Sequence, residues 1–345
     1  MLTAWLAACS SSEQRSSGQT SAASSKAELG PADIVALEAP GANGLSGLTV
    51  DDAGTLWSLA ERIRVLVSST ARPGTGGTGA AAREYQLTGV PDGRELESIA
   101  WLGKNRFAIG TEGTCDGKAY RILIVEVSGN AARVLDAIEM PYALWPQAPC
   151  NARRGLEALC HAGGQLVVAV EQPHQAEDGR RVALVGRVDL NSRAVVPYRV
   201  ALTSDKGKIS ALHCDRARAA SSSADAGASA SSKGTAGAPS GTGGIVAMAI
   251  ERHFSVARLI AFRVPESPSS GRAPPILPAE VVADVYPYTT GGKRNFEGLV
   301  RLGERRVGII VDNHYAKVTG PNELLWLQLP AGQATETEPV KPVKH

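Results

Sequence analysis

The chain is poor in aromatic residues and has almost no net charge, and each shortage excludes a class of protein. Aromatic side chains make up 5% of the 345 residues, and 36 Lys and Arg residues nearly balance 34 Asp and Glu residues, which leaves a formal net charge of +2. A nucleic-acid-binding protein usually carries a clear basic excess, so no nucleic-acid partner is expected. No stretch approaches the roughly 20 apolar residues of a membrane-spanning helix. Apolar spacing of the helical period is also absent, although a hydrophobic content of 43% allows a sizeable core.

Two motifs of catalytic and metal sites are missing as well. No serine lies in a GxSxG sequence, which excludes the nucleophile elbow of the α/β-hydrolases. No two cysteines have CxxC spacing, so no zinc site is predicted. Candidate general bases are therefore the loop histidines His174, His253 and His314.

The N-terminus has features of an export signal. Leu6-Ala7-Ala8-Cys9 resembles the lipobox of bacterial lipoproteins, in which the cysteine becomes the lipid-modified first residue. We therefore expect residues 1–9 to be a signal that ends at Cys9, followed by a flexible Ser-rich tether over residues 10–30. Ser10, rather than Asp, after the cysteine favours the outer membrane, so the predicted location is the cell envelope facing the periplasm, with the lipid as the only membrane contact. The alternative is an unmodified cysteine in a frayed tail.

One pattern recurs five times along the chain. Each copy begins with a polar, a small and an aliphatic residue and ends with a short apolar run closed by an acid. The copies span residues 46–61, 97–112, 157–171, 210–251 and 297–312. The first polar residue and the closing acid are 14 or 15 positions apart in four copies, and 41 apart in the fourth, which residues 217–244 interrupt. This insertion is almost wholly Ala, Ser, Gly and Thr, so we expect it to be disordered, as we do the tail at 331–345.

Two further strand-like runs follow each copy, which gives four short strands per repeat. Four strands in about 40–60 residues are typical of a β-propeller blade. The last repeat has only three strands, ending at 323–329, and a strand at 34–38 would supply the fourth and close the ring. We predict an all-β propeller of five four-stranded blades over residues 31–330. Six blades are the alternative, if 259–264 and 281–286 form a blade of their own.

The repeat places a ring of carboxylates at one mouth of the propeller channel. When the strands of a blade are named A to D from channel to rim, the start of A and the end of B lie on the same face. The A-start positions hold Glu97, Glu157 and Glu297, with Ser46 and Ser210 in the other two blades. The B-end positions hold Glu61, Glu112, Glu171, Glu251 and Asp312. Eight carboxylates would repel one another unless nearby positive charges neutralise them.

Two sources of that positive charge are open. Basic side chains next to the ring could form salt bridges between blades. A cation such as Ca²⁺, which favours several oxygen ligands, is the alternative, with Glu97, Glu157 and Glu297 as candidate ligands. Interleaved acids and bases favour an asymmetric pocket for a small polar or phosphorylated ligand over a symmetric metal cage. The predicted ligand-binding residues are Glu61, Arg62, Glu112, Arg154, Glu171, Glu251, Arg252, Arg294, Asp312 and Asn313.

Four cysteines remain besides Cys9, which is compatible with two disulfides in an exported protein. Four cysteines allow three pairings. Blade geometry places Cys115 and Cys150 in neighbouring loops of one face, and Cys160 and Cys214 in strands A of adjacent blades. We therefore favour the pairs Cys115–Cys150 and Cys160–Cys214.

Several segments resemble the phytase-like domain of exported bacterial proteins, a family named for the esterase-like activity of phytase. They are residues 44–51 (GLSGLTVD), 154–159 (RGLEAL), 295–299 (NFEGL) and 311–314 (VDNH). The resemblance covers roughly residues 34–329 and departs from the usual spacing at the insertion in the fourth repeat. It implies hydrolysis of phosphate or carboxyl esters.

Two functions follow as alternatives. In the first, the protein hydrolyses esters, with Glu97, Glu157, Glu297 and His314 as the candidate catalytic residues and a cation that activates water. In the second, it is a non-catalytic envelope module that binds a polar ligand or a protein partner at the same face. The protein is expected to act as a monomer in either role. Turnover of an ester substrate distinguishes the two.

Overall fold

The computed structural model describes residues 29–30, 32–74, 80–113, 119–146, 154–216, 244–266, 273–312 and 321–330. Regular structure in these ranges is β-strand apart from two short 3-10 helices, η1 (Tyr142–Leu144) and η2 (Tyr286–Thr289). No helix in this part of the chain has the length and apolar character that crossing a membrane requires.

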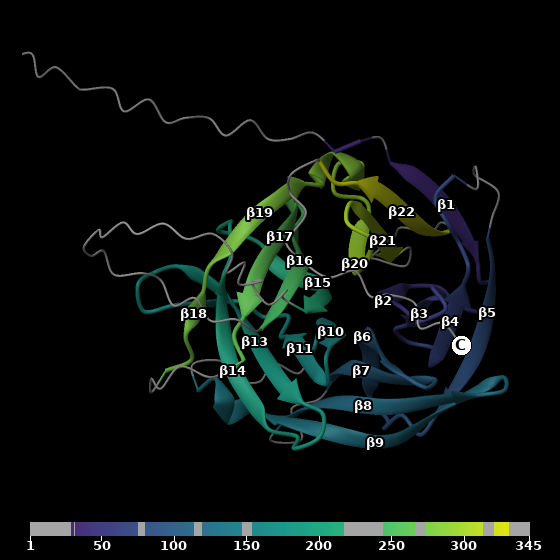
Figure 1. Ribbon diagram of the computed structural model, residues 1–345, viewed down its shortest axis with the longest axis horizontal. Coiled ribbons are helices and arrows are strands. Elements are labelled where there is room, and N and C mark those ends of the chain that lie inside the picture. Colours follow the sequence, from purple (N-terminus) through teal and green to yellow (C-terminus); the bar gives the residue numbers. More distant parts are fainter. Residues whose placement is uncertain are drawn as a thin grey trace, which may run out of the picture.

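The strands form five blades around a common axis (Figure 1). Blade 1 contains β2 (Leu45–Val50), β3 (Leu56–Ala60), β4 (Val65–Ser69) and β5 (Ala80–Thr88). Blade 2 contains β6 (Arg94–Gly103), β7 (Arg106–Gly113), β8 (Ala119–Ser128) and β9 (Ala131–Pro141). Blade 3 contains β10 (Ala158–Ala162), β11 (Gln165–Ala169), β13 (Arg181–Asp189) and β14 (Val195–Ala201), with the two-residue β12 (His174–Gln175) beside β13. Blade 4 contains β15 (Lys208–Arg216), β16 (Ile245–His253), β17 (Val256–Val264) and β19 (Ala279–Asp284), while β18 (Ile276–Leu277) lies parallel to β14.

The fifth blade closes the ring with the N-terminal strand, as predicted. It consists of β20 (Asn295–Leu302), β21 (Arg306–Asp312), β22 (Asn322–Gln328) and β1 (Asp33–Glu38). β1 pairs antiparallel with β22, from Asp33 opposite Trp326 to Leu37 opposite Asn322. The six-blade alternative is wrong, because residues 259–264 lie in β17 and β17 pairs directly with β19 inside blade 4.

The hydrophobic core lies between neighbouring blades. β3 and β4 are buried at every residue, because each is covered by other blades or strands on both faces, and their sequences therefore lack the apolar–polar alternation of a half-buried strand. Three aromatic residues pack between blades 1 and 2, where the centroid of the Trp57 ring lies 5.1 Å from that of Tyr85 and 4.8 Å from that of Phe107.

Small residues bring strands A close together at the axis. A Cβ on Gly298 would lie 2.6 Å from the carbonyl carbon of Gly47, so glycine is required where blades 5 and 1 meet. The hydroxyls of Ser46 and Ser210, the two gaps in the carboxylate ring, donate to the main-chain carbonyls of Glu97 and Phe296 in the next blade. These serines therefore link adjacent blades.

A disulfide joins Cys160 and Cys214 in strands A of blades 3 and 4, which confirms that predicted pair. Cys9, Cys115 and Cys150 lie outside the described residues, so the lipidation site and the second pair stay predictions. Most of the Ala/Ser-rich insertion lies outside them too. Its flanks fall where the spacing placed them, between the end of β15 at Arg216 and the start of β16 at Ile245.

Candidate functional site

The residues at the start of each strand A lie at the mouth of the channel. In blades 2 and 5 a β-bulge leaves Glu97 and Glu297 unpaired in the register, and Ser210 takes the same place in blade 4. A bulge re-aims the side chain that it carries. Two residues earlier in the chain, Glu95 and Asn295 pair with the B-end acids Glu112 and Asp312, which brings A-start and B-end side chains together as predicted. The main-chain N–H groups of Glu61 and Glu171 bond the equivalent carbonyls of Gly44 and Gly155.

Blade 4 departs from the predicted ring. Its register pairs Lys208 with Arg252, so Arg252 occupies the B-end position, and Glu251 pairs with the core residue Ile209. Glu251 is fully buried, and its carboxylate accepts four hydrogen bonds from Thr203 and Ser204. The structure therefore places a cation where the sequence pattern placed the acid.

Lys208 and Arg252 of blade 4 form ion pairs with three carboxylates of the neighbouring blades, Glu157, Glu171 and Glu297. Nζ of Lys208 lies 2.6 Å from Oε1 of Glu157 and also bonds Glu171. Arg252 bonds Glu297 and lies 3.6 Å from Glu157. The side chains of Glu157 and Glu297 are each only 6% exposed, so these ion pairs are largely shielded from water.

Two further contacts complete this basic half of the mouth. Arg154 bonds Glu171, although the arginine side chain is 44% exposed. Nδ2 of Asn295 donates to Oε1 of Glu297 at 2.6 Å and to Oδ2 of Asp312 at 3.2 Å. Burial lowers the pKa of Lys208, but the carboxylates around it, chiefly Glu157, raise that pKa by more, so the net shift is upward. Lys208 therefore stays charged.

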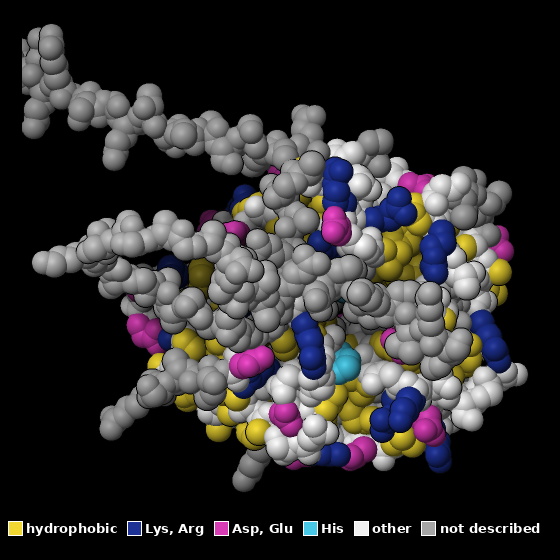
Figure 2. Space-filling model, viewed as in Figure 1, with side chains coloured by type: hydrophobic (Ala, Val, Ile, Leu, Met, Phe, Trp, Pro, Cys, Tyr) yellow, Lys and Arg dark blue, Asp and Glu magenta, His cyan; other side chains and the backbone are white. Residues whose placement is uncertain are grey.

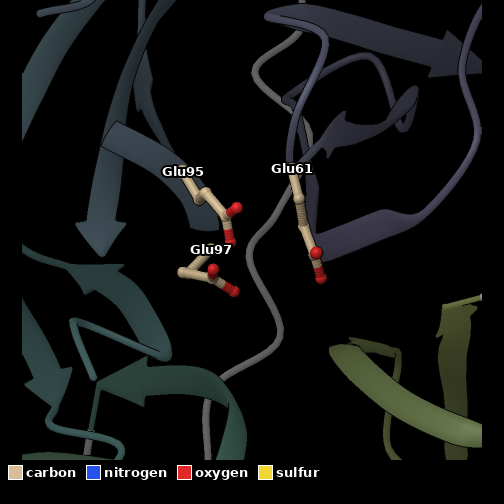
Figure 3. Close-up of side chains that lie close together, drawn as sticks. All are labelled: Glu61, Glu95 and Glu97. Atoms are coloured by element: carbon tan, nitrogen blue, oxygen red, sulfur yellow. The ribbon is translucent and has the colours of Figure 1, made fainter. Parts of the chain in front are cut away.

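The opposite half of the mouth is acidic. Glu95 and Glu97 extend from β6 toward Glu61, which follows the end of β3 (Figure 3). One carboxylate oxygen from each of these three residues lies within 4.8 Å of the others. Glu97 is only 7% exposed, and no described side chain donates a hydrogen bond to its carboxylate. Among the described residues, the cation in contact with this triad is Arg62, whose Nε lies 3.6 Å from Oε1 of Glu95, and the Arg62 side chain is 63% exposed.

The pKa values of the acidic half reflect burial without sufficient counter-charge. Burial, followed by the charge of Asp312, raises the pKa of Glu61 to about 9. Burial, together with the charges of Glu157 and Glu61, raises the pKa of Glu97 well above its usual value. Burial and the charge of Glu171 raise the pKa of Glu112 to about 8. In the absence of a bound cation, this half holds protons near neutral pH.

The predicted site residues divide into three groups. Glu61, Glu97, Glu112, Glu157, Glu171, Glu297, Asp312, Arg62, Arg154 and Arg252 lie at the mouth. The guanidinium of Arg294 bonds both oxygens of Glu323, an acid outside the predicted ring. Asn313 and His314 lie outside the described residues. His253 is exposed on the turn after β16, and His174 lies on β12.

The predicted ligand set Glu97, Glu157 and Glu297 is not the group that converges. Glu157 forms an ion pair with Lys208, and Glu297 forms one with Arg252. Glu97 instead converges with Glu61 and Glu95. Sequence reasoning missed Glu95 and Lys208, although both stand two residues before an A-start position, where the repeat alternation points them to the same side.

Surface charge elsewhere is mixed. On the face shown in Figure 2, Lys and Arg side chains alternate with Asp and Glu, and no large area of one sign is visible outside the grey atoms.

Comparison with known proteins assigns the chain to a family. The model of the phytase-like family, described as esterase-like activity of phytase, matches residues 40–315. The chain belongs to this family. No curated protein matches it.

Among solved structures, a PQQ-bound aldose sugar dehydrogenase from Streptomyces coelicolor aligns at 10% identity over 86% of this chain and 98% of that chain, with a TM-score of 0.41. A catalytically inactive virginiamycin B lyase from Staphylococcus aureus with quinupristin aligns at 10% identity over 87% and 100%, with a TM-score of 0.36.

Proposed function

We propose that the acidic half of the mouth of this phytase-like propeller binds a divalent cation, Ca²⁺ being the best fit. Oxygens that share a calcium ion at about 2.3–2.6 Å lie at most about 5 Å apart, and the oxygens of Glu61, Glu95 and Glu97 meet that limit. The set contains only oxygen donors, which suits Ca²⁺ rather than Zn²⁺. The proposal rests on Glu97, whose side chain is buried and whose carboxylate accepts no hydrogen bond from a side chain of the described residues.

The reaction proposed for this site is hydrolysis of a phosphate or carboxyl ester. A bound divalent cation supplies a Lewis acid that polarises an ester oxygen and lowers the pKa of water. Arg62 and Arg154 are the exposed cations at the mouth, so they can attract an anionic substrate. Lys208 and Arg252 instead hold Glu157, Glu171 and Glu297 in place.

Hydrolysis is tested with phytate and p-nitrophenyl esters, assayed with calcium and with a chelator. Turnover is expected with calcium, and its loss is expected both with chelator and in the Glu97→Gln variant. A Glu126→Gln variant is the matched control, because Glu126 lies on β8 of the same blade and pairs with Arg133 away from the mouth. Absence of turnover under every condition would contradict the enzymatic role.

One observation favours the alternative of a non-catalytic binding module. No histidine among the described residues bonds a carboxylate of the mouth, so none is placed there as a general base. Such a module would be stabilised by its ligand without converting it. Thermal stabilisation by phytate without turnover would support this role.

We also propose that the chain is exported and lipid-anchored through Cys9. The Cys160–Cys214 disulfide supports an oxidising compartment. Metabolic labelling with a fatty acid is expected to mark the wild-type protein in the membrane fraction of a bacterial host, and Cys9→Ser should abolish both the label and the membrane association. A labelled Cys9→Ser variant would contradict the anchor.

A further inference from the structure

A cleft of about 530 Å³ lies on the same face as the mouth, between blades 3 and 4. One wall is the segment between β11 and β13, and the other is the segment between β14 and β15. Both connect strand ends on the face where the carboxylates gather. The volume is within the range of small-molecule sites.

The two walls converge at the mouth. Glu171 belongs to the first wall, two residues before Pro173, where the lining of the cleft begins, and the second wall ends directly before Lys208. Because Nζ of Lys208 bonds the carboxylate of Glu171, this ion pair joins the walls at their inner ends. The cleft therefore extends outward from the pocket to which the proposed function assigns the ester.

The second wall is held in place from below by Glu251. The main-chain N–H groups of Thr203 and Ser204 each lie 2.9 Å from a Glu251 oxygen, and their hydroxyls donate to the same oxygens at 2.6 and 2.5 Å. A Cβ on Gly207 would lie 2.3 Å from Oε1 of Glu251, so the wall approaches the carboxylate as only glycine permits. A fixed wall of this kind is preorganised for a ligand.

Arg181, which lines the cleft, forms no ion pair with a described carboxylate. Nε of Arg181 donates to the carbonyl of Gly207 at 2.9 Å, and Nη2 lies 3.4 Å from that of Lys206, so its partners are neutral main-chain groups. Arg180, which also lines the cleft, pairs with Asp178. Burial, followed by the charge of Arg181, lowers the pKa of the half-buried His174, which lines the cleft as a neutral ring.

We propose that this cleft binds an oxyanion, a carboxylate or a phosphate, carried by the ligand that occupies the mouth, with Arg181 as its principal contact. The link to the mouth rests on the proposed function, whereas binding of the anion does not. Asp205, the acid that lines the cleft, disfavours a second negative group beside it and so limits the cleft to one anion.

The probes are inorganic phosphate and citrate, titrated into the whole protein by calorimetry with EDTA present, so that a cation at the mouth does not contribute. Arg181→Gln removes the charge but keeps an N–H donor near the position of Nε for the carbonyl of Gly207, and we expect it to weaken binding about tenfold or more. Arg193→Gln is the control, since Arg193 lies at the opposite end of blade 3 and pairs with Asp136. Arg154→Gln separates binding at the mouth from binding in the cleft.

A preference for phosphate or for citrate identifies the anion. Failure of both probes to bind, or equal affinity in the wild type and Arg181→Gln, would overturn the proposal. Absence of ester turnover refutes the proposed function but leaves anion binding in EDTA intact. Conversely, an active protein whose KM ratio for anionic and neutral esters is unchanged by Arg181→Gln would show that the cleft does not serve the mouth.

Discussion

Calcium is expected to raise the melting temperature of the wild-type protein by several degrees at pH 8, and Glu97→Gln should lose most of that rise. The reason is that Glu61, Glu95 and Glu97 present three converging oxygens, and within the described residues their ion pairing is limited to the 3.6 Å contact between Arg62 and Glu95. A ligand that binds the native state alone stabilises it by about 2.7 kcal/mol when its concentration is about 100 times Kd. Scanning calorimetry with calcium and with EDTA measures the difference.

The variant is expected to fold, because glutamine has nearly the shape of the protonated Glu97 side chain, the form that burial and the neighbouring acids favour. Glu126→Gln should keep the whole calcium effect. The pH dependence provides a second check: with EDTA, stability should fall as pH rises from about 5 to 9, because the pKa of Glu61 is raised to about 9 and native protein then binds more protons than unfolded protein. Calcium should reverse this fall at high pH. A full calcium effect in Glu97→Gln would contradict the assignment of the ligands.

Replacing Lys208 by methionine is expected to lower the free energy of unfolding by about 3–5 kcal/mol, the usual effect of removing one partner of a buried ion pair. Lys208 is 20% exposed as a side chain and neutralises Glu157 and Glu171 at once. Urea denaturation at pH 8 measures the change. The loss should be smaller at pH 5, because burial raises the pKa of Glu171 and this carboxylate then takes up a proton more readily.

Lys104→Met is the matched control for that experiment, because Lys104 is exposed in the turn between β6 and β7. Its effect should stay within about 0.5 kcal/mol, as for most surface substitutions. Equal stability of Lys208→Met and Lys104→Met would show that the carboxylates of the basic half do not need Lys208.

Much of the fold could be predicted because each blade is encoded by a local sequence pattern of short apolar strands. Apolar strands of fixed spacing and a solitary strand at 34–38 predict the closure of the ring and favour five blades over six, and the pairing of β17 with β19 decides between the two. The Cys160–Cys214 pair follows from the same repeat, since both cysteines fall in strands A of adjacent blades.

The charge distribution at the mouth could be predicted only in part. The spacing of the fourth copy predicted Glu251 at the B-end position, but the strand register places Arg252 there. The sequence could not predict this shift, because it does not show how the chain turns around the 28-residue insertion. A slip of one residue in a strand moves a side chain to the other face. That slip exchanges an acid for a base, and with Lys208 it divides the mouth into a basic and an acidic half.

The central claim is that the acidic half holds a cation, and crystals grown with calcium test it most directly. The account predicts one strong anomalous peak within about 2.3–2.6 Å of oxygens from Glu61, Glu95 and Glu97, and its disappearance in Glu97→Gln. A peak bound instead by Glu157 and Glu297, or a mouth without a peak at saturating calcium, would contradict it.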